Sequence, residues 1–299
     1  MSEKQAPPPF EPNTSLKAAM GVFEKHMEHQ GFSEHTIKAF LSDMGILGQF
    51  VGIGRAVGDI GTKDLRDFLD WLQKGRGVPC NAKSLARRLT ALKVFFGWLV
   101  KAGVLEIDPA APVIHQPVST PLPKILKEAE IERVLAVTRS LRHPAPGARP
   151  DARPHLLVTL LLQTGIKKAE CMNLVLNHLD LETPAVWIRY QDPRRRHKER
   201  KLRLPQEWPA VLKEYQGQHE TEDAIFSCTA RNLEYVLADV AQAANLPNGI
   251  SFEMLRWTSA ARDYEAKMSA ERQRQKMGLS KASWREVKVK LARLAQKAL

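Results

Sequence analysis

A proline-rich stretch near the middle of the chain most strongly limits how the chain can fold. Residues 108–123 read DPAAPVIHQPVSTPLP and hold five prolines in 16 residues. Proline lacks a backbone N–H and fixes φ, so this stretch cannot continue a helix and is expected to be extended. We therefore expect a flexible lead at 1–14, a first domain at 15–106, a linker at 107–123 and a second domain at 124–299.

The hydrophobic pattern differs between the two parts. The first part holds four segments with apolar residues at helical spacing, and Ser33 and Gly75 are typical cap residues for two of them. The second part mixes helices, one expected at 168–179, with two strand-like runs, AVWIRYQ and KERKLRLP, which flank a basic turn. The expected fold class is mainly α (α+β): a four-helix domain, then a mixed helical domain with a small antiparallel sheet.

The charge of the chain indicates a polyanionic partner. Lys and Arg number 45 against 33 acidic residues, which gives a net charge of +12. The first 118 residues contribute 14 basic and 12 acidic residues, so the excess lies in the rest of the chain, with 31 and 21. A basic excess of this size favours binding to nucleic acid or another polyanion, although a solvated basic surface would have the same composition.

Other classes of protein are disfavoured by composition. No apolar run is long enough to span a membrane, and the polar, Pro-rich start lacks the apolar core of a signal peptide, so we expect a cytoplasmic protein. The three cysteines are scattered and have no metal-site spacing among themselves or with histidine. We therefore expect neither a metal site nor a cofactor.

Several strings, in consistent order, resemble the phage integrase family of tyrosine recombinases. GFSEHTIKAFLSDMGILGQFV and SLARRLTALKVFFGWLVKAGVLEIDPA resemble its core-binding helices, and LPKILKEAEIERVL resembles the start of its catalytic domain. TGIKKAECMNLVLNHLDL and MLRWTSA resemble its two signature boxes. The resemblance covers about residues 15–290. It implies a four-helix SAM-like domain followed by the family's catalytic-domain fold.

The family's chemistry implies a defined set of residues. A Tyr hydroxyl attacks a DNA phosphodiester and forms a 3′-phosphotyrosyl bond. Two Arg residues stabilise the charge on the non-bridging oxygens. A Lys on the β-hairpin protonates the leaving 5′ oxygen, and His residues assist proton transfer.

Most of these positions hold a different residue here. The resemblance assigns the catalytic positions to Lys167, Arg195, Glu253, Arg256, Leu279 and Lys288. Only Arg256 keeps the family's residue type, and a shifted hairpin register would put Lys198 in place of Arg195. Lys288 stands where the nucleophilic Tyr is expected, and no Tyr follows Tyr264. We therefore expect a catalytically inactive homologue, with a displaced nucleophile at Tyr264 as the alternative.

DNA binding is expected to survive because the substitutions keep or add cations, and phosphate neutralisation supplies most of the affinity for duplex DNA. The expected DNA-binding residues are Lys83, Arg87, Arg88, Lys167, Arg194, Arg195, Arg196, Lys198, Arg256 and Lys288. The expected function is a duplex-DNA-binding pseudo-recombinase that acts as an accessory or architectural factor in DNA recombination, integration or transposition. The alternatives are an active recombinase that uses Tyr264 and a protein-interaction subunit of an active recombinase.

The expected partners are double-stranded DNA, an active tyrosine recombinase, and a second copy of the chain. The C-terminal run VKLARLAQKAL is amphipathic. In the family such a helix can dock on a neighbouring subunit, which implies an oligomer here. Packing of the same helix on its own domain is the equally weighted alternative.

Overall fold

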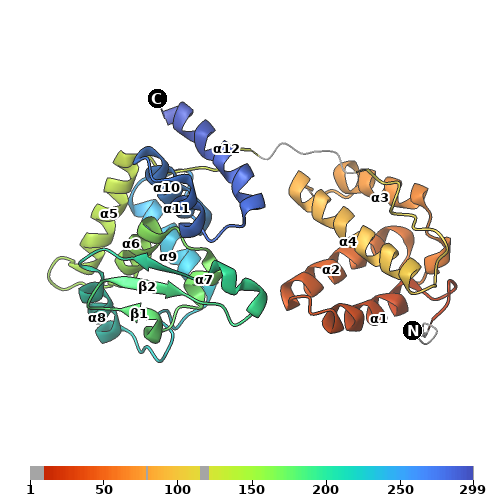
Figure 1. Cartoon of the computed structure of the whole chain (residues 1–299), viewed down its shortest axis with the longest axis horizontal. Helices are drawn as coiled ribbons and strands as arrows, with labels where there is room; N and C mark the ends of the chain where they lie inside the picture. Colours follow the sequence, from red (N-terminus) through yellow and green to blue (C-terminus); the bar gives the residue numbers. More distant parts are fainter. Residues whose placement is uncertain (1–9, 79, 115–120, 299) are drawn as a thin grey trace. The chain divides into compact units, whose positions relative to one another are not determined.

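The computed structural model describes residues 10–78, 80–114 and 121–298. Its internal contacts divide the chain into two units, Met1–Thr120 and Pro121–Leu299 (Figure 1). Two parts of the expected domain plan lie outside the described residues: most of the lead (1–9) and the middle of the linker (115–120).

The first unit contains four α-helices, as the sequence predicts. They are α1 (Leu16–His29), α2 (Glu34–Val51), α3 (Thr62–Lys74) and α4 (Ala82–Lys101), with a 3-10 turn, η1 (Val57–Asp59), before α3. The side chains of Ser15, Ser33 and Asn81 accept backbone N–H groups at the starts of α1, α2 and α4, as capping residues do. Apolar side chains from all four helices form one core, in which Phe23 contacts Phe95 edge to face.

The second unit is built around α6 (Arg153–Thr164), the most deeply buried of its helices. Helix α6 packs against α5 (Glu128–Arg142), α8 (Trp208–Gln218), α9 (Ala230–Ala243) and α10 (Phe252–Glu265). The shorter helices α7 (Lys168–Met172) and α11 (Ala270–Lys276) and the last helix, α12 (Lys281–Ala298), complete the unit. In the part of the chain that the structure describes, no helix combines the length and the apolar composition needed to cross a membrane.

A small antiparallel sheet carries the basic turn. Its strands lie in the order β1 (Leu179–Asp180), β2 (Ala185–Ile188), β3 (Arg200–Arg203). Val186 pairs with Leu202, and both are buried, so one face of the sheet packs on the core. The turn between β2 and β3 contains a 3-10 segment, η3 (Pro193–Lys198). The predicted hairpin and the mainly helical fold class are confirmed.

Two elements differ from the sequence prediction. The helix expected at 168–179 ends at Met172, because the chain then pairs with a distant segment: Ile225 N–H donates to Leu174 O and Leu176 N–H donates to Asp223 O. A short 3-10 turn, η2 (Leu176–His178), follows there. Helix α11 was missed, since AERQRQK carries no apolar repeat that could have indicated it.

The last helix packs on its own unit. The buried side chains of Trp284, Leu291 and Leu294 lie in one apolar cluster with Ala260 of α10 and Met277. This contact covers the apolar stripe that the sequence shows in α12. The expected oligomer through the C-terminal helix stays a prediction.

Candidate nucleic-acid interface

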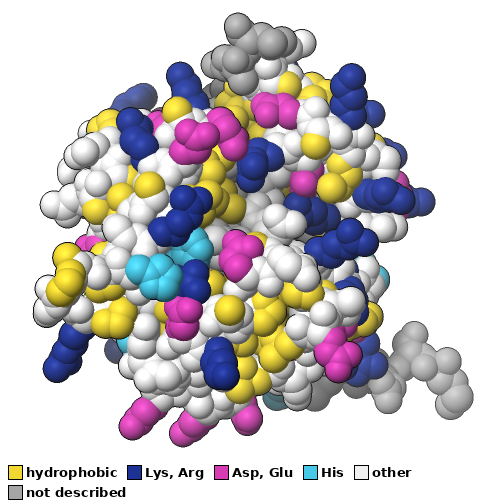
Figure 2. All heavy atoms as spheres, turned by 90° about the vertical axis from the view of Figure 1, so that its left-hand side faces the viewer, with side chains coloured by type: hydrophobic (Ala, Val, Ile, Leu, Met, Phe, Trp, Pro, Cys, Tyr) yellow, Lys and Arg dark blue, Asp and Glu magenta, His cyan; other side chains and the backbone are white. Residues whose placement is uncertain are grey.

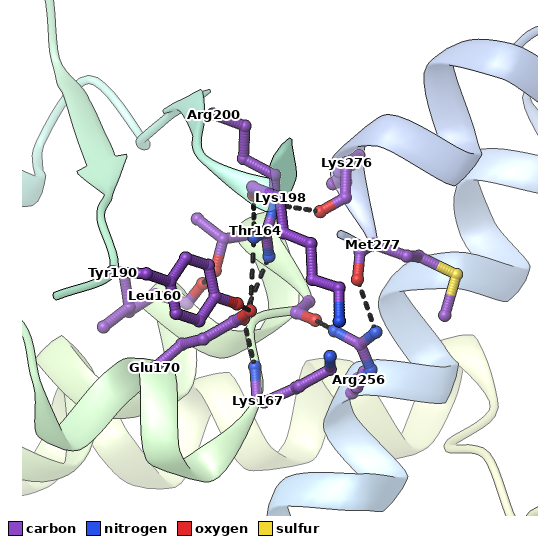
Figure 3. A network of polar contacts seen from close by, with 11 residues as sticks. Leu160, Thr164, Lys167, Glu170, Tyr190, Lys198, Arg200, Arg256, Lys276 and Met277 are labelled. Carbon is purple, nitrogen blue, oxygen red and sulfur yellow. Dashed lines mark hydrogen bonds and ion pairs between the residues drawn. The ribbon is translucent and has the colours of Figure 1, made fainter. Parts of the chain in front are cut away.

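Three cationic side chains converge from distant segments of the second unit. Lys167 is the residue before α7, Lys198 ends η3, and Arg256 lies on α10. Figure 3 shows the charged ends of all three directed into one region between these elements. We call Lys167, Lys198 and Arg256 the cation cluster. Three converging cations are suited to binding a phosphate or another oxyanion.

The turn after α6 brings Lys167 close to Arg256. Gly165 ends α6 with φ of 60°, a left-handed conformation that favours glycine. A Cβ at this residue would lie 3.2 Å from the side chain of Ser259, a tight contact that would require Ser259 to shift by a few tenths of an ångström. The Arg256 guanidinium donates to Gly165 O and, over 2.7 Å, to Met277 O, which fixes its position.

A buried carboxylate lies behind the cation cluster. Glu170 is 5% exposed and accepts hydrogen bonds from the Lys167 backbone N–H over 2.8 Å and from Arg200 over 2.9 Å. The Tyr190 hydroxyl donates to the same carboxylate. We call Glu170, Tyr190 and Arg200 the Glu170 anchor. Because Tyr190 and Arg200 stand on either side of the basic turn, the anchor holds both ends of that turn against α7 (Figure 3).

The electrostatics of this region favour a bound anion. Burial alone would raise the pKa of Glu170, but the hydrogen bonds and charge of Arg200 lower it to about 2. Burial lowers the pKa of Lys167, and it lowers the pKa of Arg256 to about 10. Burial and the hydrogen bond to Glu170 raise the pKa of Tyr190 to about 12. At neutral pH Glu170 is therefore ionised, Tyr190 is neutral, and the positive charges outnumber the single carboxylate.

The basic turn places its arginines in solvent. Arg194, Arg195 and Arg196 are exposed, whereas Lys198 is partly buried beside Arg256. The turn is started by Asp192, whose carboxylate accepts the Arg194 backbone N–H and lies 3.7 Å from the Arg195 side chain. Of the two hairpin registers left open by the sequence, the structure brings Lys198 into the cation cluster. A lysine can donate a proton at neutral pH far more readily than an arginine.

The remaining family positions lie elsewhere. Glu253 is exposed on the first turn of α10, and Leu279 packs beside the apolar cluster under α12. Lys288 is exposed on α12 and lines a hollow of about 450 Å³ together with Tyr264 and Trp284. The structure therefore does not bring Lys288 into the cation cluster.

The candidate residues of the first unit lie on α4 and differ in how freely they could contact DNA. Arg88 is partly buried, with its Nε 3.4 Å from the carboxylate of Asp43, which is 2% exposed. Arg87 contacts the same carboxylate but remains exposed, and Lys83 is exposed. Their DNA contacts stay a prediction. Arg88 has a structural role in addition, because it balances a buried charge.

Replacing Arg88 with alanine is expected to destabilise the first unit. Asp43 would keep only Arg87 as a partner, and the loss is expected to be about 2 kcal/mol of unfolding free energy, measured by hydrogen exchange of α2 and α4 amides. Lys83→Ala is the control, since an exposed side chain should change stability by less than about 0.5 kcal/mol. Equal exchange in the two variants would contradict a structural role for Arg88.

The sequence reasoning missed the Glu170 anchor. One signal was available: Glu170 follows Lys167 by three residues at the start of a helix, which is the spacing of a capping carboxylate. The partners Tyr190 and Arg200 belong to the hairpin strands, and no local pattern links them to α7.

Charge alone does not single out this region. The face of the second unit that Figure 2 presents shows Lys and Arg side chains interspersed with Asp and Glu. The cation cluster and the basic turn are distinguished by convergence and by fixed geometry. Both follow from the packing of α6, α7, α10 and the hairpin.

Comparison with known proteins gives relatives that are named tyrosine recombinases. The chain is 31% identical over 166 residues to tyrosine recombinase XerC of Mycobacterium leprae (strain TN), covering 54% of each chain. It is 32% identical over 167 residues to tyrosine recombinase XerC of Mycobacterium bovis (strain BCG / Pasteur 1173P2), covering 55% of this chain and 54% of the relative. The match thus spans about half the length of these relatives.

Two solved structures share the fold. A lambda integrase dimer bound to a COC′ core site matches with a TM-score of 0.69 and 14% identity, covering 91% of this chain and 77% of that one. The Tn1549 transposon integrase (Y379F) in complex with transposon right end DNA matches with a TM-score of 0.69 and 17% identity, covering 94% and 100%. At these identities the likeness concerns the fold.

The comparison corrects one expectation from the sequence. The prediction that the chain is not an enzyme is wrong, because the relatives that it matches at 31% and 32% identity are named tyrosine recombinases. That prediction assumed that the chain loses a catalytic function wherever another residue replaces one of the family's catalytic residues. At the hairpin, the structure brings Lys198 into the cation cluster and leaves Arg195 exposed.

Family models cover most of the chain. Residues 22–103 match the phage integrase N-terminal SAM-like domain, and residues 124–282 match the phage integrase family. The two matches fall in the first and second units in the order that the sequence resemblance implies. The resemblance is therefore confirmed, and the chain belongs to the phage integrase family.

Proposed function

We propose that this chain binds duplex DNA and takes part in DNA recombination. The observation that carries the proposal is the convergence of Lys167, Lys198 and Arg256 beside an exposed turn with three further arginines. The family membership supports it, as do the relatives named tyrosine recombinases and the structures of integrases bound to DNA.

The cation cluster suits one backbone phosphate. Arg256 uses part of its donor set on two backbone carbonyls, and its other N–H groups are available for an oxyanion. Lys167 and Lys198 add ammonium groups from two other segments. The basic turn extends the positive surface, so neighbouring phosphates would be neutralised and their counterions released.

The role that follows is to hold DNA for recombination, integration or transposition. The first unit would add further contacts through α4, and linking two binding units raises the affinity of the whole chain above that of either unit. An active tyrosine recombinase and a second copy of the chain stay the predicted partners. The cytoplasmic location likewise stays a prediction.

The proposal is tested by measuring binding of the full chain to random-sequence duplex DNA across a salt series. We expect submicromolar affinity at low salt that weakens steeply as salt rises, with a logarithmic slope of about −0.9 for each phosphate contacted. Absence of binding at low salt would overturn the proposal and favour a subunit that only contacts other proteins.

Strand cleavage by the chain itself is a second candidate function. The observation that favours it is the hollow that Tyr264 shares with Lys288, the position that the family resemblance gives to the nucleophile. In this reaction the Tyr264 hydroxyl would lose its proton to solvent and its oxygen would form a bond to phosphorus. The bond between phosphorus and the 5′ oxygen would break, and that oxygen would leave with a proton from Lys198. The required movement is large, since eight residues of helix separate Tyr264 from Arg256 by about 12 Å.

If Tyr264 is the nucleophile, a nicked duplex is expected to trap a covalent protein–DNA adduct, seen as a slow band on a denaturing gel. Tyr264→Phe should abolish the adduct, because a phenyl ring has no attacking oxygen. Tyr235→Phe is the control, since Tyr235 is exposed on α9 and lies outside the hollow. An adduct that persists in Tyr264→Phe would exclude this residue.

A further inference from the structure

A hollow of about 590 Å³ lies beside strand β3. Two of its lining residues, Arg200 and Lys276, also belong to the polar network around the cation cluster (Figure 3), whereas Lys167, Lys198 and Arg256 do not line it. Its lining comes from β3, the end of α6, the end of α10 and helix α11: Gln163, Arg200, Lys201, Leu202, Arg203, Asp263, Met268, Arg272, Gln275 and Lys276. We call it the β3 hollow. Neither the proposed DNA contacts nor the family positions use its outer walls.

The walls of the β3 hollow are strongly cationic. Five of its lining residues are Lys or Arg, and one is acidic. Three of the cations are balanced within the unit: Arg200 by Glu170, Lys201 by Asp180 and Lys276 by Asp263.

Two cations of the hollow remain available. Arg203 on β3 and Arg272 on α11 are exposed, and within residues 10–78, 80–114 and 121–298 neither side chain is paired with a carboxylate. They stand on elements that pack against each other. Two available guanidinium groups on facing elements are suited to bind carboxylates with paired hydrogen bonds.

Strand β3 adds a second kind of recognition. It is the edge strand of the sheet, paired only with β2 among the described strands. The outer edge of such a strand presents backbone N–H and C=O groups that an extended peptide can pair with. The hollow therefore offers backbone pairing and positive charge along the same strand.

The chain's own last helix does not have the charge to occupy this hollow in a second copy. Among the residues of α12 whose side chains are described, the cations are Lys281, Arg285, Lys288, Lys290 and Arg293, and the one acid is Glu286. A basic segment facing a basic hollow is repelled. Duplex DNA fits less well than a peptide, because its rigid backbone presents phosphates on a convex surface and the hollow is concave.

We propose that the β3 hollow binds an acidic, extended segment of another protein, with Arg203 and Arg272 pairing with its carboxylates. The segment lies along the outer edge of β3 and adds to the sheet. The hollow is thus a site of protein–protein contact that operates beside the DNA-binding surface and does not depend on it.

The test uses a fluorescent peptide of alternating Glu and Thr as the probe, with an alternating Gln and Thr peptide to measure binding without charge. Fluorescence anisotropy with the full chain is expected to show binding of the Glu peptide alone. Arg203→Glu and Arg272→Glu should each weaken that binding at least about fivefold. Arg194→Glu is the matched control: it removes an exposed arginine of the basic turn outside the hollow and should leave peptide binding within about twofold.

Three outcomes would overturn the proposal. The first is equal loss of peptide binding in all three variants, which would show attraction to net charge alone. The second is weakened binding of duplex DNA in Arg272→Glu, which would make the hollow part of the DNA surface. The third is loss of a homo-oligomer in Arg272→Glu, seen by sedimentation, which would make a second copy the occupant. If Arg194→Glu loses DNA binding but keeps peptide binding, the result supports two separate sites.

Discussion

Alanine at Arg194, Arg195 and Arg196 together is expected to cause the largest loss of DNA affinity. The three side chains are exposed on a turn whose ends are fixed by the Glu170 anchor, so their charge is available and their position is defined. The logarithmic salt slope of binding should become less steep by about 1 for each phosphate that the variant no longer neutralises, so by up to about 3. Arg195 should contribute least, because Asp192 already lies 3.7 Å from it.

The control for this variant removes the same charge elsewhere on the second unit. Arg133, Arg149 and Lys213 are exposed and lie outside the turn and the cation cluster. Their replacement by alanine should leave the salt slope close to that of the unmodified chain. The slope reflects the phosphates neutralised at the contact, and the effect of distant charges is largely screened by salt. Equal slopes for the two triple variants would show that the turn makes no specific contact.

Replacing Glu170 with alanine is expected to cause the largest loss of stability. The carboxylate is buried and balances Arg200, so its removal leaves a buried cation without its carboxylate partner and two further donors unsatisfied. The expected loss is about 3–5 kcal/mol of unfolding free energy, measured by chemical denaturation. Glu128→Ala is the control, since Glu128 is exposed and its pair with Arg262 lies at the surface.

The Glu170 carboxylate should also make the stability of the chain depend on pH, with stability falling at acidic pH. The pKa of Glu170 is lowered from 4.5 to about 2 in the folded chain. Its stabilising contribution is therefore complete above about pH 4.5 and is lost as the pH falls toward 2. Between pH 4.5 and pH 2, the free energy of unfolding of the unmodified chain should fall by about 3 kcal/mol more than that of the Glu170→Gln variant. Parallel pH profiles for the two proteins would contradict the pairing of Glu170 with Arg200.

The sequence predicted the fold where local signals and burial agree. The helices of the first unit have polar caps and apolar spacing, and the hairpin has alternating strands around a polar turn, so each local pattern pointed to the observed element. It failed at 173–179, where pairing with residues 223–225 overrides helix propensity, and at α11, which is mostly polar.

The sequence predicted some of the residues of the candidate site, but it did not predict how these residues are arranged. The sequence identified Lys167 and Arg256 through the family resemblance, and the structure brings both into one cluster. It left the hairpin register open between Arg195 and Lys198, because a run of neighbouring cations fits either alignment. The Glu170 anchor joins residues 20 and 30 positions apart through side chains, and such interactions leave no local pattern.

The fixing of the basic turn at both ends has a consequence for how this protein can change over evolution. Tyr190 and Arg200 set where the turn begins and ends, and the exposed residues between them contribute little to the core. Substitutions at Arg194 and Arg196 should therefore cost little folding energy. The turn can thus acquire a new preference for its binding partner while the rest of the unit keeps its packing, which separates selection for recognition from selection for folding.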